Sequence, residues 1–378
     1  MMMGGYAMIY LDHAATTPIR PEVIDAMTPY YSCRFANASS GYTSARETRK
    51  AIDYARNQIA ASINAKRSEV YFTSGGSEAD NWAIIGAALA APEKKHIITS
   101  RIEHHAVLHT CAMLEGMGYS ITYLDVDHLG RISPAEAKMA IRPDTLMISL
   151  MLANNEIGTI EPVEDIAQIA KEAGVLVHTD AVQAVGHIPV DVRALGVDML
   201  SMSAHKFQGP KGTGCLYIRE GVRIGPLIYG GAQERGMRAG TENTPCIVGM
   251  GRALELACSE MPQEIERIAV LKDRLAAEIE DIPGLHINGD RGNSLPGVLH
   301  ATIDAANTAL LLMQMDMAGV AVSGGSACAS GAAERSHVVT ALGYTDDHQA
   351  DIRFSLGKGN SESDIDAAAA ALRRCLKR

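Results

Sequence analysis

A lysine with a histidine directly before it stands where one β-rich run of the sequence ends. The run covers residues 198–202, and Ser203, His205 and Lys206 follow it, ahead of a glycine-rich turn. A lysine amine attacks a carbonyl to form a Schiff base when its surroundings keep it unprotonated. Most lysines are instead exposed to solvent, so this interpretation depends on which groups stand at the ends of the neighbouring runs.

An aspartate stands at the end of another β-rich run. Residues 175–179 form that run, Asp180 follows it, and Gln183 comes a little later in the chain. A carboxylate in this place can hold a proton on the ring nitrogen of pyridoxal phosphate (PLP), which lets the ring accept electrons from a reacting carbon. An isolated aspartate of this kind is more often a turn residue or a helix cap.

Three more segments that follow β-rich runs carry groups that suit the same cofactor. Gly76 and Ser77 open a helical segment, where unpaired N–H groups and the helix dipole favour a phosphate. The flat ring of His104 can stack on a planar cofactor, and the amide of Asn155 can hydrogen-bond to its hydroxyl group. Because ligands bind beyond the carboxyl ends of parallel strands, we expect these strand ends to meet at one cofactor site.

The seven cysteines are scattered along the chain, and no two of them form a C-x-x-C pair. This pattern favours unpaired thiols in a reducing compartment over disulfides or a metal-ligand set. Cys328 differs from the others because it lies among glycine, serine and alanine residues (321–331), a segment that can carry a thiol to a substrate. Arg353, in the β-rich run 351–355, suits the carboxylate of an amino-acid substrate.

Length and pattern place these residues in an α/β protein of 378 residues. Between residues 69 and 203 β-rich runs alternate with helical patterns, which predicts a mostly parallel sheet with helices on both faces. A long helix follows residue 241, with a break expected at Pro262, and leads to a smaller α+β domain. We therefore expect a large domain at 15–255 and a small domain formed by 1–14 and 256–378.

Charge and hydropathy argue against two classes of partner. The formal net charge is −10, which disfavours a nucleic-acid-binding surface. No apolar run approaches the roughly 18 residues that span a membrane, and the first residues lack the blocks of a signal peptide. We expect a cytoplasmic protein without nucleic-acid or membrane partners.

Taken together, these motifs resemble cysteine desulfurases of the iron–sulfur-cluster and nitrogen-fixation type, in the class V aminotransferase family. The resemblance covers nearly the whole chain. It implies a fold-type I PLP-dependent transferase with a mostly parallel seven-stranded sheet in the large domain. The matching segments are 10–18 (YLDHAATTP), 73–78 (TSGGSE), 103–104 (EH), 154–158 (NNEIG), 178–183 (HTDAVQ), 203–206 (SAHK), 235–241 (RGMRAGT) and 325–330 (GSACAS).

The resemblance also implies roles for single residues. L-cysteine would be the substrate and L-alanine the product, with the sulfur passing as a persulfide to Cys328 and then to an iron–sulfur scaffold or another acceptor. Lys206, Cys328 and His104 are the implied catalytic residues, and Asn37 and Arg353 the implied ligands of the substrate carboxylate. The implied contacts of PLP are Gly76, Ser77, His104, Asn155, Asp180, Gln183, Ser203, His205 and Lys206, with Thr241 reaching in from the second subunit of a homodimer.

Some alternatives and departures stay open. No resident metal is implied, and transient contact of Cys328 with a cluster is the one metal interaction to consider. We hypothesise that a cation, His104, helps the Cys328 thiol to ionise. Selenocysteine lyases, transaminases and a non-catalytic sulfur carrier are alternatives on the same scaffold. Cys328 argues against a transaminase, and Lys206 argues against the non-catalytic carrier. Residues 35–40 read Phe-Ala-Asn-Ala-Ser-Ser, whereas the family has a proline after the asparagine.

Overall fold

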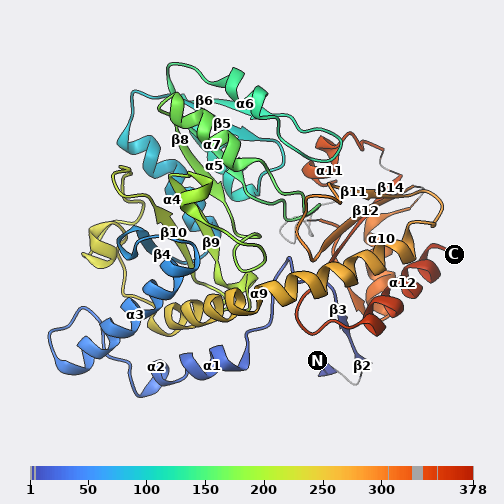
Figure 1. The fold of residues 1–378 in the computed structure, drawn as a ribbon, viewed down its shortest axis with the longest axis horizontal. Coiled ribbons are helices and arrows are strands. Elements are labelled where there is room, and N and C mark those ends of the chain that lie inside the picture. The colour runs from blue at the N-terminus through green and yellow to red at the C-terminus, as the bar shows by residue number, and fades with distance from the viewer. Residues whose placement is uncertain (1, 4–5, 305, 326–334, 347, 378) are drawn as a thin grey trace.

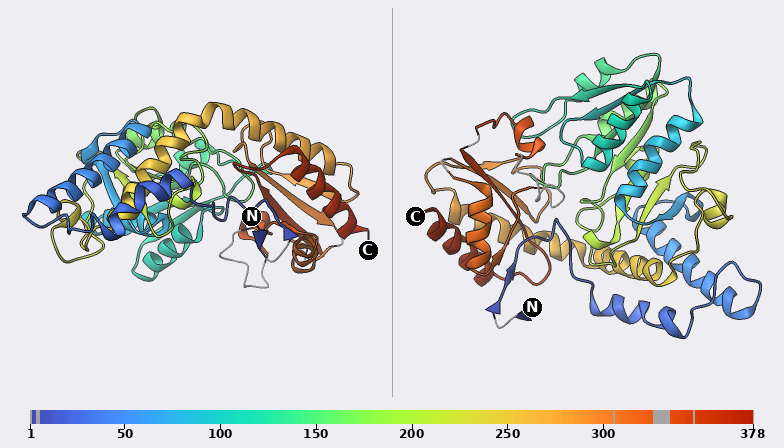
Figure 2. Two further views of the ribbon diagram at one scale, coloured as in Figure 1. Left: turned by 90° about the horizontal axis from the view of Figure 1, so that it is seen from below. Right: turned by 180° about the vertical axis from the view of Figure 1, so that it is seen from behind.

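The computed structural model describes residues 2–3, 6–304, 306–325, 335–346 and 348–377. Two bodies of secondary structure lie side by side in it, and the long helix α9 (Thr244–Ile279) runs along both (Figures 1 and 2). We predicted a break of this helix at Pro262, and that prediction was wrong, because the helix continues through the proline.

The larger body is built on a sheet of seven strands in the order β4-β10-β9-β8-β7-β5-β6. All neighbours in it are parallel except β10, which is antiparallel to both strands beside it. The mostly parallel seven-stranded sheet is therefore confirmed. Its strands are β4 (Val70–Thr73), β5 (His96–Ser100), β6 (Ser120–Leu124), β7 (Thr145–Met151), β8 (Leu176–Asp180), β9 (Met199–Ser203) and β10 (Gly214–Ile218).

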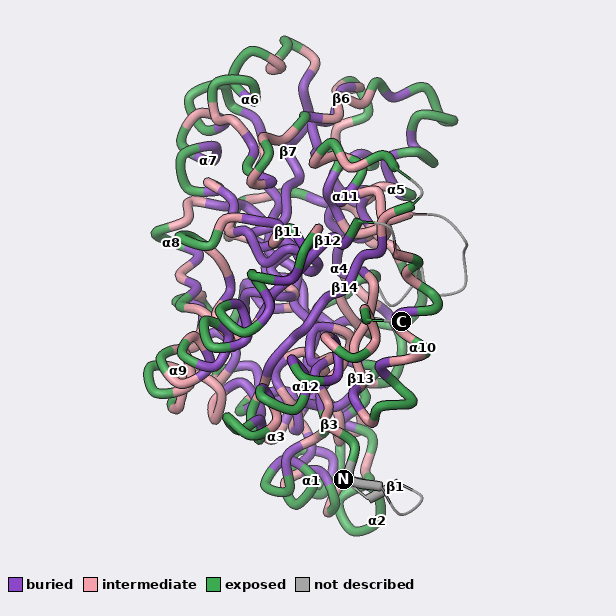
Figure 3. Tube along the Cα trace, turned by 90° about the vertical axis from the view of Figure 1, so that its right-hand side faces the viewer, coloured by how far each residue is buried: buried purple, intermediate pink, exposed green. Residues whose placement is uncertain are grey.

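Helices cover both faces of this sheet, as its buried strands require. Successive side chains of a strand point to opposite faces, so Ile97 and Ile98 of β5 belong to different hydrophobic cores. One core lies under α4 and α5, and the other under α3, α7 and the first half of α9. In Figure 3 most of the interior of the molecule is coloured as buried, and the exposed residues lie on the helices and loops around it. These helices are α3 (Thr43–Ser62), α4 (Gly76–Ala90), α5 (His105–Gly116) and α7 (Val163–Glu172).

The smaller body holds an antiparallel sheet of three strands in the order β11-β12-β14. Its core includes Leu271 and Leu275 from the second half of α9, whereas Met250 and Leu254 from the first half belong to a core of the large sheet. The expected boundary at 255/256 thus falls inside one continuous helix, and the domain division stays a prediction. The elements are β11 (Leu285–Asn288), β12 (Val298–Asp304), β14 (Gln349–Ser355), α10 (Thr308–Met317), α11 (His337–Ala341) and α12 (Glu362–Leu376).

The start of the chain joins this smaller body. Strand β3 (Ile9–Tyr10) pairs in parallel with β13 (Val320–Ala321), and residues 12–17, which we name the N-terminal segment, then cross to the large sheet. Within the described residues, no helix is both long and apolar enough to cross a membrane. The remaining short elements are β1 (Met2–Met3), β2 (Tyr6–Ala7), α1 (Pro21–Met27), α2 (Pro29–Ser32), η1 (Arg67–Glu69), α6 (Pro134–Ala140), α8 (Val192–Leu195), η2 (Ala204–Lys206) and η3 (Gln233–Gly236).

Candidate active site

A cavity of about 770 Å³, part of it open to solvent, lies at the carboxyl ends of the parallel strands. The structure brings most of the sequence-predicted residues together there. Cys328 lies outside the described residues, and Asn37 and Thr241 do not line the cavity. The predicted residues that do line it are Gly76, Ser77, His104, Asn155, Asp180, Gln183, Ser203, His205, Lys206 and Arg353.

Lys206 is held at the floor of this cavity by the N-terminal segment. The strand β9 ends at Ser203, and the short helix η2 places Lys206 directly after it. Its Nζ donates hydrogen bonds to the carbonyl oxygens of Ala14 and Ala15, at 2.5 and 3.0 Å. These two carbonyls fix the direction of the amine within the cavity.

Asp180 stands at the end of β8 and faces the same space. Its Oδ1 accepts a hydrogen bond from the backbone N–H of Val182 at 2.9 Å. Burial raises the pKa of Asp180 to about 6, and the nearby charge of Lys206 opposes that rise. Above that pH Asp180 is a buried carboxylate, which is the group that keeps a ring nitrogen protonated. Gln183 is fixed beside it by a 2.9 Å hydrogen bond from its Nε2 to the oxygen of Ala14.

A cradle for an anion lies at the start of α4. A Cβ added to Gly76 would lie 2.6 Å from Cγ2 of Val182, so a larger residue here would push against Val182, which also lines the cavity. The N–H groups of the first turn and the dipole of a 15-residue helix face the cavity here. The side chains of Ser77, Ser203 and His205 add donors around the same point, and His205 is held by Thr16 through a 3.2 Å hydrogen bond.

His104 caps α5 and presents its ring to the cavity. Its Nδ1 accepts a hydrogen bond from the N–H of Ala106 at 3.1 Å. Burial, together with the charge of Lys206, lowers the pKa of His104 to about 4. The ring is therefore neutral at neutral pH and can stack on a planar group, but it does not supply the positive charge that we expected it to offer Cys328.

Arg353 reaches the cavity from β14 of the smaller body and is 1% exposed. Its Nη1 donates to the backbone oxygen of Asn155, and its Nη2 pairs with Oδ1 of Asp12, both at 2.9 Å. Sequence reasoning missed Asp12 as the partner of Arg353, although Asp12 stands in the matching segment 10–18. An aspartate two residues after a short apolar strand was the available signal.

Asp80 also lines the cavity and was missed. It lies one helical turn after Ser77 on α4, which puts the two side chains on the same face. The sequence signal was present in that spacing, but a polar residue inside a helix is more often a solvated one.

Two predicted residues lie elsewhere in the single chain. Asn37 is exposed, and its Oδ1 accepts a hydrogen bond from the N–H of Ser39 at 2.9 Å. Thr241 is also exposed and comes just before α9. The role of Thr241 depends on a second subunit, and both assignments stay predictions.

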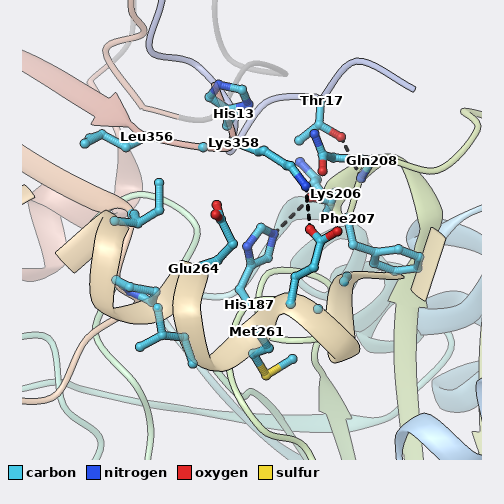
Figure 4. Close-up of a pocket in the computed structure, with 18 of the residues that line it drawn as sticks. His13, Thr17, His187, Lys206, Phe207, Gln208, Met261, Glu264, Leu356 and Lys358 are labelled. Carbon is cyan, nitrogen blue, oxygen red and sulfur yellow. Dashed lines mark hydrogen bonds and ion pairs between the residues drawn. The ribbon is translucent and has the colours of Figure 1, made fainter. Parts of the chain in front are cut away.

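A second cavity, of about 650 Å³ including its open part, lies next to the first (Figure 4). Lys206 contributes to the lining of both cavities. His187 is fixed here by a 2.9 Å hydrogen bond to the backbone oxygen of Lys206. Glu260 of α9 forms ion pairs with both Arg20 and Lys358. These ion pairs link the two bodies next to Lys206.

The residues of the first cavity fit PLP. The cradle at Gly76 suits its phosphate, the carboxylate of Asp180 its ring nitrogen, and the amine of Lys206 its aldehyde. A lysine and an aspartate at the carboxyl edge of a mostly parallel sheet, with an anion cradle beside them, define the class of fold-type I PLP-dependent enzymes.

Comparison with known proteins gives the family. The chain belongs to the aminotransferase class-V family, whose model matches residues 9–368. It is 51% identical to the cysteine desulfurase IscS of Methanosarcina thermophila over 360 residues, covering 95% of this chain and 89% of the relative. It is 50% identical to the cysteine desulfurase IscS of Dictyoglomus turgidum, covering 98% of this chain and 95% of the relative.

Solved structures agree with this assignment. A NifS-like protein superposes with a TM-score of 0.92 at 37% identity, covering 98% of this chain and 99% of the other. SspA in complex with cysteine gives a TM-score of 0.80 at 38% identity, covering 92% of this chain and 98% of the other. The predicted family, the fold and the cysteine desulfurase function are thereby confirmed, and the family is PLP-dependent.

Proposed function

We propose that this chain binds PLP in the cavity around Lys206, takes L-cysteine as its substrate and passes the sulfur to Cys328 as a persulfide. The convergence of Lys206, Asp180 and Arg353 on one cavity carries the proposal, because an amine, a buried carboxylate and a guanidinium suit the aldehyde, the ring nitrogen and the substrate carboxylate. Gly76, which lines the cavity at the start of α4, supports a phosphate beside them.

When bound, PLP supplies an electron sink for the carbon atoms of the substrate. The residues of this chain bind and orient the reactants around it. Arg353 takes the substrate carboxylate with the N–H groups that Asp12 and Asn155 leave available. Nζ of Lys206 would hold the proton removed from the α-carbon of the substrate. Asp180, as a carboxylate, would hold the proton of the ring nitrogen in place.

Sulfur transfer then conserves atoms and electrons. The thiolate of Cys328 forms a bond to the substrate sulfur while the bond between that sulfur and the substrate β-carbon breaks. The electron pair of the broken bond stays with the carbon, which takes up a proton and becomes the methyl group of L-alanine. The sulfur remains on Cys328 as a persulfide. Because His104 is neutral, another positive group has to favour the thiolate.

Three further features belong to the proposal. The working unit is a homodimer in which Thr241 serves the cavity of the partner subunit, and Asn37 joins Arg353 in binding the substrate carboxylate. The persulfide is passed on to a sulfur acceptor protein, such as an iron–sulfur scaffold. The cytoplasm, a reducing compartment, suits a persulfide-forming thiol.

Intact-protein mass spectrometry after addition of L-cysteine tests the assignment of Cys328. The wild-type protein is expected to gain one sulfur atom, and Cys328→Ser is expected to gain none. Cys33→Ser is the matched control, because Cys33 is an exposed thiol outside the cavity, and it should behave like the wild type. If Cys328→Ser released sulfide at the wild-type rate without added thiol, the assignment would be wrong.

A further inference from the structure

Asp80 is a buried acid at the wall of the cofactor cavity that the proposed mechanism leaves without a role. It is 1% exposed and lines the cavity from α4. Its Oδ1 has no hydrogen-bond partner among the described residues. A buried carboxylate in this condition is costly, and such groups are usually paired or protonated.

His178, a basic residue beside Asp80, does not provide a charge for it. Nε2 of His178 lies 3.6 Å from Oδ1 of Asp80. His178 is fully buried between two serine hydroxyls, with Nδ1 at 2.9 Å from Oγ of Ser149 and Nε2 at 2.9 Å from Oγ of Ser201. Burial lowers the pKa of His178 to about 3, so its ring is neutral. Asp80 thus faces a neutral ring, not an imidazolium.

The other charged groups around Asp80 are mostly acids. Asp180 on β8 and Glu103 after β5 both act on it through their negative charge. Burial first, and the charge of Asp180 second, raise the pKa of Asp80 well above its usual range, and a side-chain hydrogen bond with Ser201 opposes this rise. Lys206 and Arg353 are the cations that line the cavity. Lys206 acts on Asp180, and Arg353 is paired with Asp12. Of the histidines that line the cavity, His104 and His205 are neutral, because burial lowers the pKa of each to about 4.

We propose that Asp80 is a positioning residue for Asp180: it holds one proton as a neutral acid beside the cavity, so that Asp180 alone carries the negative charge of the two. This inference rests on the proposed cofactor site. The negative charge of one buried carboxylate is balanced by the positive charge of one protonated ring nitrogen. A second ionised carboxylate would add an uncompensated negative charge in the same low-dielectric space.

The proton on Asp80 also determines how the neighbouring polar chain is arranged. A neutral histidine has one N–H donor and one acceptor nitrogen. With Asp80 protonated, Ser201 does not need to donate to it and can donate to Nε2 of His178, which leaves Nδ1 to donate to Ser149. A protonated Asp80 therefore favours this tautomer of His178, which lies on the strand that carries Asp180.

Infrared spectroscopy of the protein without added cofactor tests the protonation directly. The wild type at neutral pH should show the carbonyl band of a buried protonated carboxylic acid, and Asp80→Asn should remove that contribution from the difference spectrum. Asp198→Asn is the matched control, because Asp198 is also buried, at 4% exposure, but does not line the cavity. It comes just before β9, at the end of the strand opposite to Ser203. An unchanged band in Asp80→Asn would overturn the proposal.

Titration with PLP separates a neutral role from a charged or structural one. Asp80→Asn is expected to keep the PLP affinity and the pH dependence of the bound absorption spectrum below neutral pH. Asp80→Ala should lose PLP affinity by roughly tenfold, the effect of one hydrogen-bonding group. If asparagine impaired binding as much as alanine, the neutral-acid role would be refuted. Failure of the wild type to bind PLP would refute the proposed function, and the infrared result would still stand by itself.

Discussion

The substitution Arg353→Lys keeps the positive charge of this position and removes its planar fork of donors. Two of the guanidinium nitrogens already bind Asn155 and Asp12, each at 2.9 Å. A guanidinium has five N–H groups spread around a plane, so others remain for a substrate carboxylate. A lysine has three N–H groups on a single nitrogen and cannot reach Asp12, Asn155 and a substrate from the same directions.

The size of the effect follows from the hydrogen bonds lost. A hydrogen bond to a charged group contributes about 1.5–3 kcal/mol, and about 1.4 kcal/mol corresponds to a factor of ten. Loss of one bond from a bidentate pair should therefore lower kcat/KM for L-cysteine by roughly 10- to 150-fold. The carboxylate does not react, and it is held equally before and during the chemical step. We therefore expect most of the loss in KM and little in kcat.

The assay is the rate of alanine formation as a function of L-cysteine concentration. Arg335→Lys is the matched control, because Arg335 is a partly buried arginine of the smaller body that pairs with Asp351 at 3.3 Å and does not line the cavity. A KM for Arg353→Lys within about twofold of the wild type would refute the reasoning. An equal loss in Arg335→Lys would show that the effect is general to the smaller body.

Two further changes probe the cradle and the buried acids. Gly76→Ala would place a Cβ 2.6 Å from Cγ2 of Val182. It should weaken PLP binding by about 1–3 kcal/mol, as measured by equilibrium dialysis. An unchanged affinity would argue against a phosphate at the start of α4. Glu161→Gln removes an acid whose pKa burial raises to about 8. Because this pKa is raised in the folded state, the free energy of unfolding of the wild type falls as the pH rises from about 5 to 8. The difference in unfolding free energy between Glu161→Gln and the wild type, measured by urea unfolding, should therefore grow over that range by at most roughly 5 kcal/mol. A difference independent of pH would contradict this.

The buried strands were predictable because each is a short apolar run followed by polar residues. The run 96–100 coincides with β5, and 120–124 with β6. β10 was not predicted, because Gly214–Ile218 follows a glycine-rich turn and has no helical crossover before it. The continuous course of α9 through Pro262 was also missed, because packing against two cores outweighed the local cost of the proline.

The candidate site was predictable where one residue type carries the chemistry at the end of a strand, as Lys206 and Asp180 do. It was not predictable where a role depends on partners far apart in sequence. The pairing of Asp12 with Arg353 joins residues at opposite ends of the chain. The neutral state of His104 depends on burial and on the charge of Lys206, and spacing reveals neither.

The N-terminal segment has a consequence for how the length of this chain can vary. Asp12 holds Arg353, and two and three residues later Ala14 and Ala15 hold Lys206, so both functional groups are anchored on one short stretch. Insertion or deletion of a single residue between these anchors would displace one of them by about 3.5 Å relative to the other. Surface loops tolerate such changes, and this stretch does not. Functional variants that differ in length should therefore keep these residues at constant spacing and take up their insertions elsewhere.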